Sequence, residues 1–76
     1  MSEIEFIDIF ADNLRDSIKE SGYSISEIAK KTNISKSTIS RYLNKKQMPT
    51  IRAVVNLSIA LLCDVKDLIP DYDKIN

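Results

Sequence analysis

The chain has 76 residues, of which 43% are apolar, one is glycine, two are proline, one is cysteine and none is histidine, and its formal net charge is zero. This length suits one small domain, residues 1–76, and the scarcity of glycine and proline favours an all-α fold. The composition excludes histidine-based nucleophile pairs, internal disulfides, the usual zinc sites and glycine-rich phosphate loops, so we expect no enzyme, metal or cofactor.

The first predicted helix spans residues 3–21. Ser2 and Glu5 fit a capping box at its start, and Gly22 stands where a left-handed terminating residue is favoured. Apolar residues recur at steps of three and four and define one face: Ile4, Ile7, Ala11, Leu14 and Ile18. Further apolar residues widen this face near its start, which indicates either burial from two sides or contact with a partner protein.

Two short helices are predicted next, over residues 24–32 and 35–44. Ser24 and Glu27 fit a second capping box, Asn33 suits a left-handed turn, and Ser35 suits the cap of the following helix. Their close spacing is typical of a helix-turn-helix, although any helical hairpin gives the same spacing.

The helix predicted over 35–44 has one apolar and one polar side. Ile39, Tyr42 and Leu43 share an arc of about 100°. The polar side carries no acid and comprises Lys36, Ser37, Ser40, Arg41 and Asn44. A merely solvated face more often mixes Glu with Lys, so this side is suited to close approach to a ligand.

The last two predicted helices span residues 50–62 and 65–69. Thr50 and Asp64 suit their caps, and Pro70 ends the second. The 50–62 helix is apolar enough to be the central core helix, through Ile51, Val54, Val55, Leu57, Ala60 and Leu61. The tail, residues 70–76, has no periodicity, so we predict a compact five-helix bundle.

The neutral net charge conceals a strong segregation along the chain. Residues 1–27 hold seven acids and two bases, residues 28–63 hold seven bases and no acid, and residues 64–76 hold four acids and two bases. Association with a polyanion depends on the local field at the contact face. The basic middle therefore favours nucleic-acid binding, with a solvated basic surface as the alternative.

Two further features of the sequence bear on where in the cell the protein is expected. The longest apolar run, Ile59 to Cys63, is far too short to cross a bilayer. The first residues carry an acid where a signal peptide carries basic residues. We therefore expect a soluble cytoplasmic protein with no membrane partner.

Residues 24–41, SISEIAKKTNISKSTISR, resemble the helix-turn-helix of the phage Cro and repressor type, the XRE family. Pro49, Thr50 and Ile51 resemble that family's next segment. The resemblance implies a lambda-repressor-like five-helix fold that binds double-stranded DNA, usually as a homodimer on a two-fold operator.

The resemblance also implies roles for single residues. Base edges in the major groove would be read by Lys36, Ser37 and Arg41. Phosphates would be contacted by Ser35, Thr38, Asn44, Lys45 and Lys46. The chemistry is consistent, because Arg and Lys donate to guanine acceptors and helix N-terminal amides suit phosphate oxygens.

The chain departs from the family pattern at several positions. Ile25 replaces a common phosphate-anchoring Gln, and Lys45 replaces a common Gly, so Asn44 or Lys45 must make the turn after the 35–44 helix. Ile18 and Leu43 replace a frequent Arg–Glu ion pair, and we predict an apolar contact between them.

An exposed apolar patch near the end of the chain is a candidate dimer contact, with core packing or a frayed tail as the alternative. Its members are Ile59, Leu62, Ile69 and Tyr72, with Ile75 nearby.

The primary hypothesis is thus a homodimeric transcription regulator, most simply a repressor of a palindromic operator. The alternative is an interaction module or antitoxin-type regulator with a protein partner.

Overall fold

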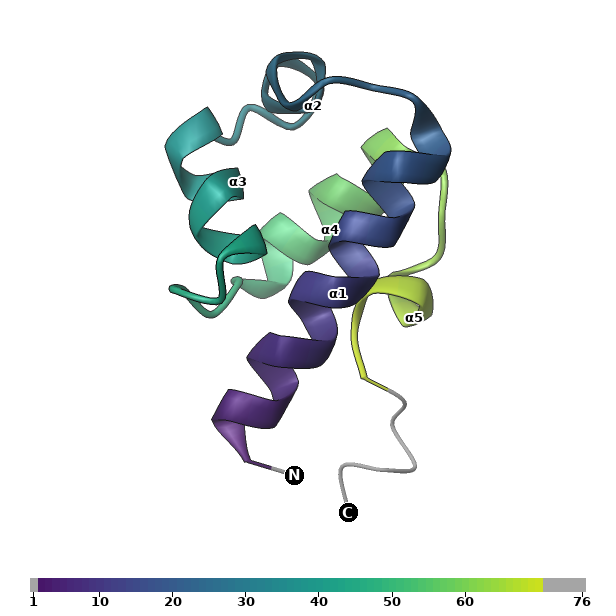
Figure 1. Ribbon diagram of the computed structural model, residues 1–76. Helices are drawn as coiled ribbons and strands as arrows, with labels where there is room; N and C mark the ends of the chain where they lie inside the picture. Colours follow the sequence, from purple (N-terminus) through teal and green to yellow (C-terminus); the bar gives the residue numbers. More distant parts are fainter. Residues whose placement is uncertain (1, 71–76) are drawn as a thin grey trace.

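The computed structural model describes residues 2–70, and over this range the chain forms five helices and no strand. The helices are α1 (Glu3–Ser21), α2 (Ile25–Thr32), α3 (Lys36–Leu43), α4 (Ile51–Leu61) and α5 (Val65–Leu68). α1 and α4 run through the middle of the molecule, and α3 and α5 lie on opposite sides of them (Figure 1). The predicted all-α, five-helix fold is confirmed.

Local capping determines where the helices begin. Ser24, Ser35 and Thr50 have extended backbones and accept hydrogen bonds from first-turn amides, so each stands just outside its helix. The predicted capping box of α2 is present, because the Ser24 hydroxyl accepts from the Glu27 amide and the Glu27 carboxylate accepts from the Ser24 amide, both at 3.1 Å. At the start of α1, Ser2 caps the Glu5 amide at 3.2 Å.

Left-handed residues end three of the helices. Gly22 after α1 has φ 73°, Asn33 after α2 has φ 59° and Leu62 after α4 has φ 55°. A residue in this conformation closes the helix C-terminus and turns the chain. Glycine and asparagine adopt it readily, whereas leucine does so at a cost in strain.

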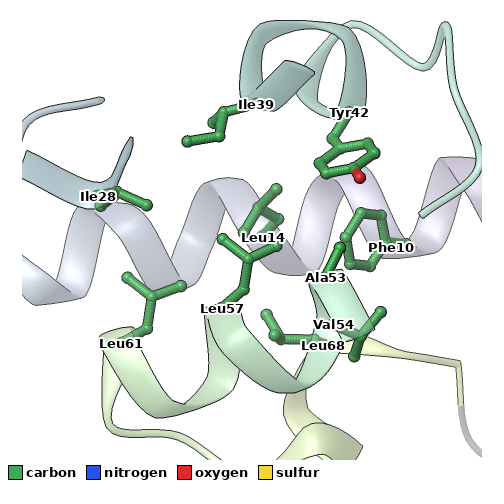
Figure 2. Packing of buried hydrophobic residues seen from close by; sticks show 10 residues of the cluster. All are labelled: Phe10, Leu14, Ile28, Ile39, Tyr42, Ala53, Val54, Leu57, Leu61 and Leu68. Carbon is green, nitrogen blue, oxygen red and sulfur yellow. The ribbon is translucent and has the colours of Figure 1, made fainter. Parts of the chain in front are cut away.

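The core takes buried side chains from every helix (Figure 2). Those with no exposed surface are Phe10 and Leu14 of α1, Ile28 of α2, Ile39 of α3, Leu57 of α4 and Leu68 of α5. The Phe10 ring meets the Tyr42 ring edge to face, with centroids 5.7 Å apart and planes at 80°. This aromatic pair joins α3 directly to the long helix α1, which positions α3 on the scaffold.

The apolar face predicted for α1 is only partly covered. Phe10, Ala11 and Leu14 are buried, but Ile4 is 74% exposed. The first turns of α1 extend past α3 and α4 (Figure 1). Ile4 belongs to the first of these turns, and its side chain is exposed accordingly. Periodicity defines the apolar face, whereas the extent of the neighbouring helices decides how much of it is buried.

α4 carries more apolar surface than is buried in the core. Val54, Leu57 and Leu61 are buried, whereas Ile51 is 86% exposed and Val55 is 38% exposed. The core packing predicted for Ile51 and Val55 is therefore wrong. None of the helices within residues 2–70 is long and apolar enough to span a membrane.

Candidate nucleic-acid interface

A short turn, residues 33–35, joins α2 to α3. The buried Thr32 hydroxyl donates to the Ile28 carbonyl oxygen at 2.7 Å and accepts from the Ile34 amide at 3.2 Å. The left-handed backbone of Asn33 then redirects the chain. These contacts order the turn and so set the direction in which α3 leaves α2.

The start of α3 has two of the predicted phosphate-contacting residues side by side. The Ser35 hydroxyl accepts from the Thr38 amide at 3.1 Å and donates to the Thr38 hydroxyl oxygen at 2.9 Å. Thr38 therefore keeps its own hydroxyl proton for an external acceptor. The first-turn amides of Lys36 and Ser37 also lack partners within the helix. Together these donors suit a phosphate oxygen at the positive end of the helix dipole.

The outer side of α3 is open. Lys36, Ser37 and Arg41 are exposed, while Ile39 and Tyr42 on the opposite side are buried. The structure thus brings the three predicted base-reading residues together on one exposed, acid-free face. Their flexible cations and the small Ser37 are suited to contact with base edges in a major groove.

Lys45 makes the turn after α3 and reaches back to α1. It has φ 61°, whereas Asn44 has φ −92°, so Lys45 occupies the position for which the resemblance suggests glycine. Its Nζ lies 3.6 Å from a carboxylate oxygen of Asp8 and 3.6 Å from one of Asp12. Lys45 would have to leave these carboxylates to contact a phosphate.

The two other predicted phosphate contacts beyond α3 are exposed. The Lys46 amide donates to the Arg41 carbonyl oxygen at 2.8 Å, which fixes the backbone while the side chain extends outward. The Asn44 side-chain amide donates to the Ser40 hydroxyl at 3.2 Å and so lies along α3.

A second link between α1 and the end of α3 comes from Arg15, which the sequence reasoning did not single out. Its Nη2 donates to the Leu43 carbonyl oxygen at 3.1 Å. A cation at a helix C-terminus is favourable because it meets the negative end of the dipole. Ile18 and Leu43 are each half-buried against the core, and their direct contact stays a prediction.

A polar hollow of about 520 Å³ lies beside α3, and sequence reasoning missed it as part of the site. Its walls include Asn33 of the turn, Tyr42 of α3, the α4 cap Thr50, and Arg52 and Asn56 of α4. Arg52 belongs to the acid-free segment, which was the available signal. Only the fold, however, places this cation beside the α2–α3 unit.

Two of the predicted dimer contacts, Ile59 and Leu62, lie at the C-terminal end of α4, whereas Ile69 directly follows α5. Ile59 is 68% exposed and Leu62 is 87% exposed, while Ile69 is half-buried. Tyr72 lies outside the described residues.

Comparison with known proteins identifies the class. A family model described as helix-turn-helix matches residues 14–68, and the chain belongs to this family, of the XRE type. It is a DNA-binding protein of the helix-turn-helix regulator class. The resemblance inferred from the sequence is confirmed.

Among solved structures, the chain is similar to the restriction-modification controller protein C.AhdI from Aeromonas hydrophila. The TM-score is 0.77 at 18% sequence identity, over 82% of this chain and 94% of that one. At this identity the likeness shows a shared fold. No curated protein matches the sequence.

Proposed function

We propose that the protein is a cytoplasmic, non-enzymatic transcription regulator, most simply a repressor, that binds a palindromic operator as a homodimer. α3 enters the major groove, and Lys36, Ser37 and Arg41 read base edges. The observation that carries the proposal is the exposed, acid-free outer side of α3 on a helix-turn-helix. The polar side of α3 does not take part in core packing. Its Lys and Arg side chains can donate hydrogen bonds to the acceptor atoms of guanine.

Phosphate contacts in this proposal surround the recognition helix. Ser35 and Thr38 contribute hydroxyls with the first-turn amides of α3, and Asn44, Lys45 and Lys46 follow the backbone beyond its end. Arg52 of α4 extends the same basic surface. These contacts fix the register of the protein on the duplex, while the base contacts select the sequence.

The proposal is tested by selecting bound sequences from a pool of random DNA duplexes. The affinity of the protein for the selected sequence is then measured at several salt concentrations. If each subunit neutralises four phosphates, the slope of log K against log salt is about −7 for the dimer. A two-fold symmetric consensus and a slope of this size support the proposal. A chain that enriches no sequence and binds no duplex at low salt overturns it.

An antitoxin-type regulator with a different protein partner is the second candidate. The observation that favours it is the large exposed apolar surface of α4, which a partner of any kind would cover. Co-purification of a second native protein in fixed stoichiometry would support this candidate.

A further inference from the structure

An apolar hollow of about 340 Å³ lies where α1, the loop before α4, α4 itself and α5 meet. The side chains that line it are all apolar and include Phe6, Met48, Ile51, Val55, Val65 and Ile69. Ile51 is 86% exposed and Val55 is 38% exposed, so part of the lining is open to solvent. Uncovered apolar surface of this kind marks a place where another group binds. Residues 2–70 do not fill the hollow.

The chain leaves the described range beside this hollow. Ile69, which lines the hollow, has an extended backbone with φ −95° and ψ 158°, and Pro70 next to it is buried. Residues 71–76 of the tail therefore start at the hollow. Because a chain spans at most about 3.6 Å per residue, the Cα atom of Tyr72 lies within about 11 Å of that of Ile69.

The chemistry of residues 71–76 suits the hollow. Their apolar side chains are Tyr72 and Ile75, at a spacing of three. Tyrosine fits an open apolar hollow because its ring is apolar while its hydroxyl can stay in water at the edge. Asp71 and Asp73 flank Tyr72 and carry charges that favour water. A volume of about 340 Å³ is at the lower end for ligand sites, so the hollow suits one or two side chains rather than a whole helix.

We propose that the tail of the same chain closes the apolar hollow, with the Tyr72 ring inserted into it and Ile75 packed at its edge. The inference goes beyond the proposed function, and it assigns Tyr72 to an intramolecular contact in place of the dimer contact expected from the sequence. Covalent attachment favours the tail over any separate occupant. A segment joined by a few residues competes at an effective concentration in the millimolar range, whereas a separate protein at about 1 μM would need an affinity about a thousandfold higher.

A tail bound in this way would also support the loop that follows the recognition helix. Met48 and Pro49 of the hollow belong to the loop between α3 and α4, which also carries Lys45 and Lys46. The Lys46 amide donates to the Arg41 carbonyl oxygen at 2.8 Å. Contact between the tail and Met48 restricts the opening of this loop. The docking of the tail does not itself depend on DNA binding.

The test is a pair of double-mutant cycles in the full chain, measured as the equilibrium constant of unfolding in urea. The first cycle combines Tyr72→Ala with Ile51→Ala, which changes the lining of the hollow. The second combines Tyr72→Ala with Ile59→Ala, at an exposed isoleucine of the same helix that does not line the hollow. We expect a coupling of at least about threefold in the first cycle, because the two substitutions remove the two sides of one contact. The second cycle should be additive within about twofold.

Tyr72→Phe is the conservative variant, because it keeps the ring that fills the hollow. The unfolding constant of Tyr72→Phe should stay within about twofold of the parent value, whereas Tyr72→Ala should raise it at least about fivefold. Equal coupling in the two cycles, or none in either, overturns the inference. A loss of stability in Tyr72→Phe as large as that in Tyr72→Ala also overturns it.

Nuclear Overhauser effects between the Tyr72 ring and the Met48 methyl group report the contact without any substitution. We expect them in dilute protein, with a relative intensity that does not change with protein concentration. Effects that grow with concentration would show that another copy supplies the tail, and missing effects would show an unfilled hollow. Either result overturns the inference.

Hydrogen exchange of the Lys46 amide tests the support of the loop. We expect exchange at least about threefold faster in Tyr72→Ala than in the parent chain, since local opening becomes easier. An unchanged exchange rate would overturn the support of the loop, while the cycles continue to decide the docking.

Discussion

Lys45 and Asp8 lie far apart in the sequence, yet the Lys45 ammonium is 3.6 Å from an Asp8 carboxylate oxygen. Asp12, one turn along α1, is equally close. The first cation beyond the recognition helix is therefore engaged by acids from another helix. The side chains of Lys45, Asp8 and Asp12 are 43%, 50% and 68% exposed, so solvent and salt reach the ion pairs and a phosphate can compete for Lys45.

Removing both carboxylates should release Lys45 for DNA. We expect Asp8→Asn with Asp12→Asn to tighten operator binding and to steepen the salt slope by about 0.9 per subunit. The free energy of unfolding should fall by less than about 1 kcal/mol, because exposed ion pairs contribute little. Fluorescence anisotropy at several salt concentrations measures the slope.

A matched control for this prediction is Asp16→Asn with Glu20→Gln. It changes the net charge equally, on the same helix, at exposed acids that are not paired with Lys45. An equal change of slope in both double variants would show that overall charge, rather than release of Lys45, is responsible.

Arg41 and Lys46 should differ in their effect on DNA recognition. Arg41→Ala is expected to cost about 1–3 kcal/mol at the selected site and to relax preference at one base pair, because a base contact is lost. Lys46→Ala should weaken all sequences alike and reduce the magnitude of the slope by about 0.9 per subunit. Parallel selections from the random pool measure both effects, and unchanged preference in Arg41→Ala would disprove its base-reading role.

The backbone of Lys45 predicts an unusual order of stability. Lys45→Gly and Lys45→Ala both remove the ion pairs, but only glycine relieves the left-handed φ of 61°. Lys45→Gly should therefore be more stable than Lys45→Ala by about 1 kcal/mol. Urea denaturation gives the difference. At Lys46, which has no positive φ, the same two substitutions should not favour glycine.

Burial of the Tyr42 ring predicts a loss of stability in alkali. Burial raises the pKa of Tyr42 above its ordinary value of 10.0, so the folded state favours the neutral phenol. This stabilisation is complete below pH 10 and is lost as the pH rises through the folded pKa. The thermal midpoint should fall above pH 10, and Tyr42→Phe should reduce that fall. An equal fall in the Tyr42→Phe variant would show that Tyr42 is not responsible.

Cys63 contributes to the same alkaline loss. Burial is the main reason that the pKa of its thiol is raised; a hydrogen bond with Ser17 opposes the shift, and nearby carboxylates add smaller upward contributions. Below pH 9 the thiol therefore stays protonated, in keeping with a packing role rather than a reactive one.

Much of the fold follows from local signals in the sequence. Ser24 with Glu27, Asn33, Ser35 and Gly22 mark helix ends through hydrogen bonds and backbone preferences that extend over only a few residues. The polar side of α3 likewise follows from helical periodicity. These features are predictable because neighbouring residues determine them.

The sequence by itself determined the helices, the helix-turn-helix and the concentration of bases in residues 28–63, since all three depend on neighbouring residues. Tertiary structure alone decided which acids pair with Lys45, that Arg52 lies beside α3, and that Ile51 and Val55 of α4 stay exposed. The physical reason is that burial and ion pairing depend on which helices pack against each other. A helix with more apolar surface than its neighbours cover does not reveal, from its own residues, which side will be left exposed.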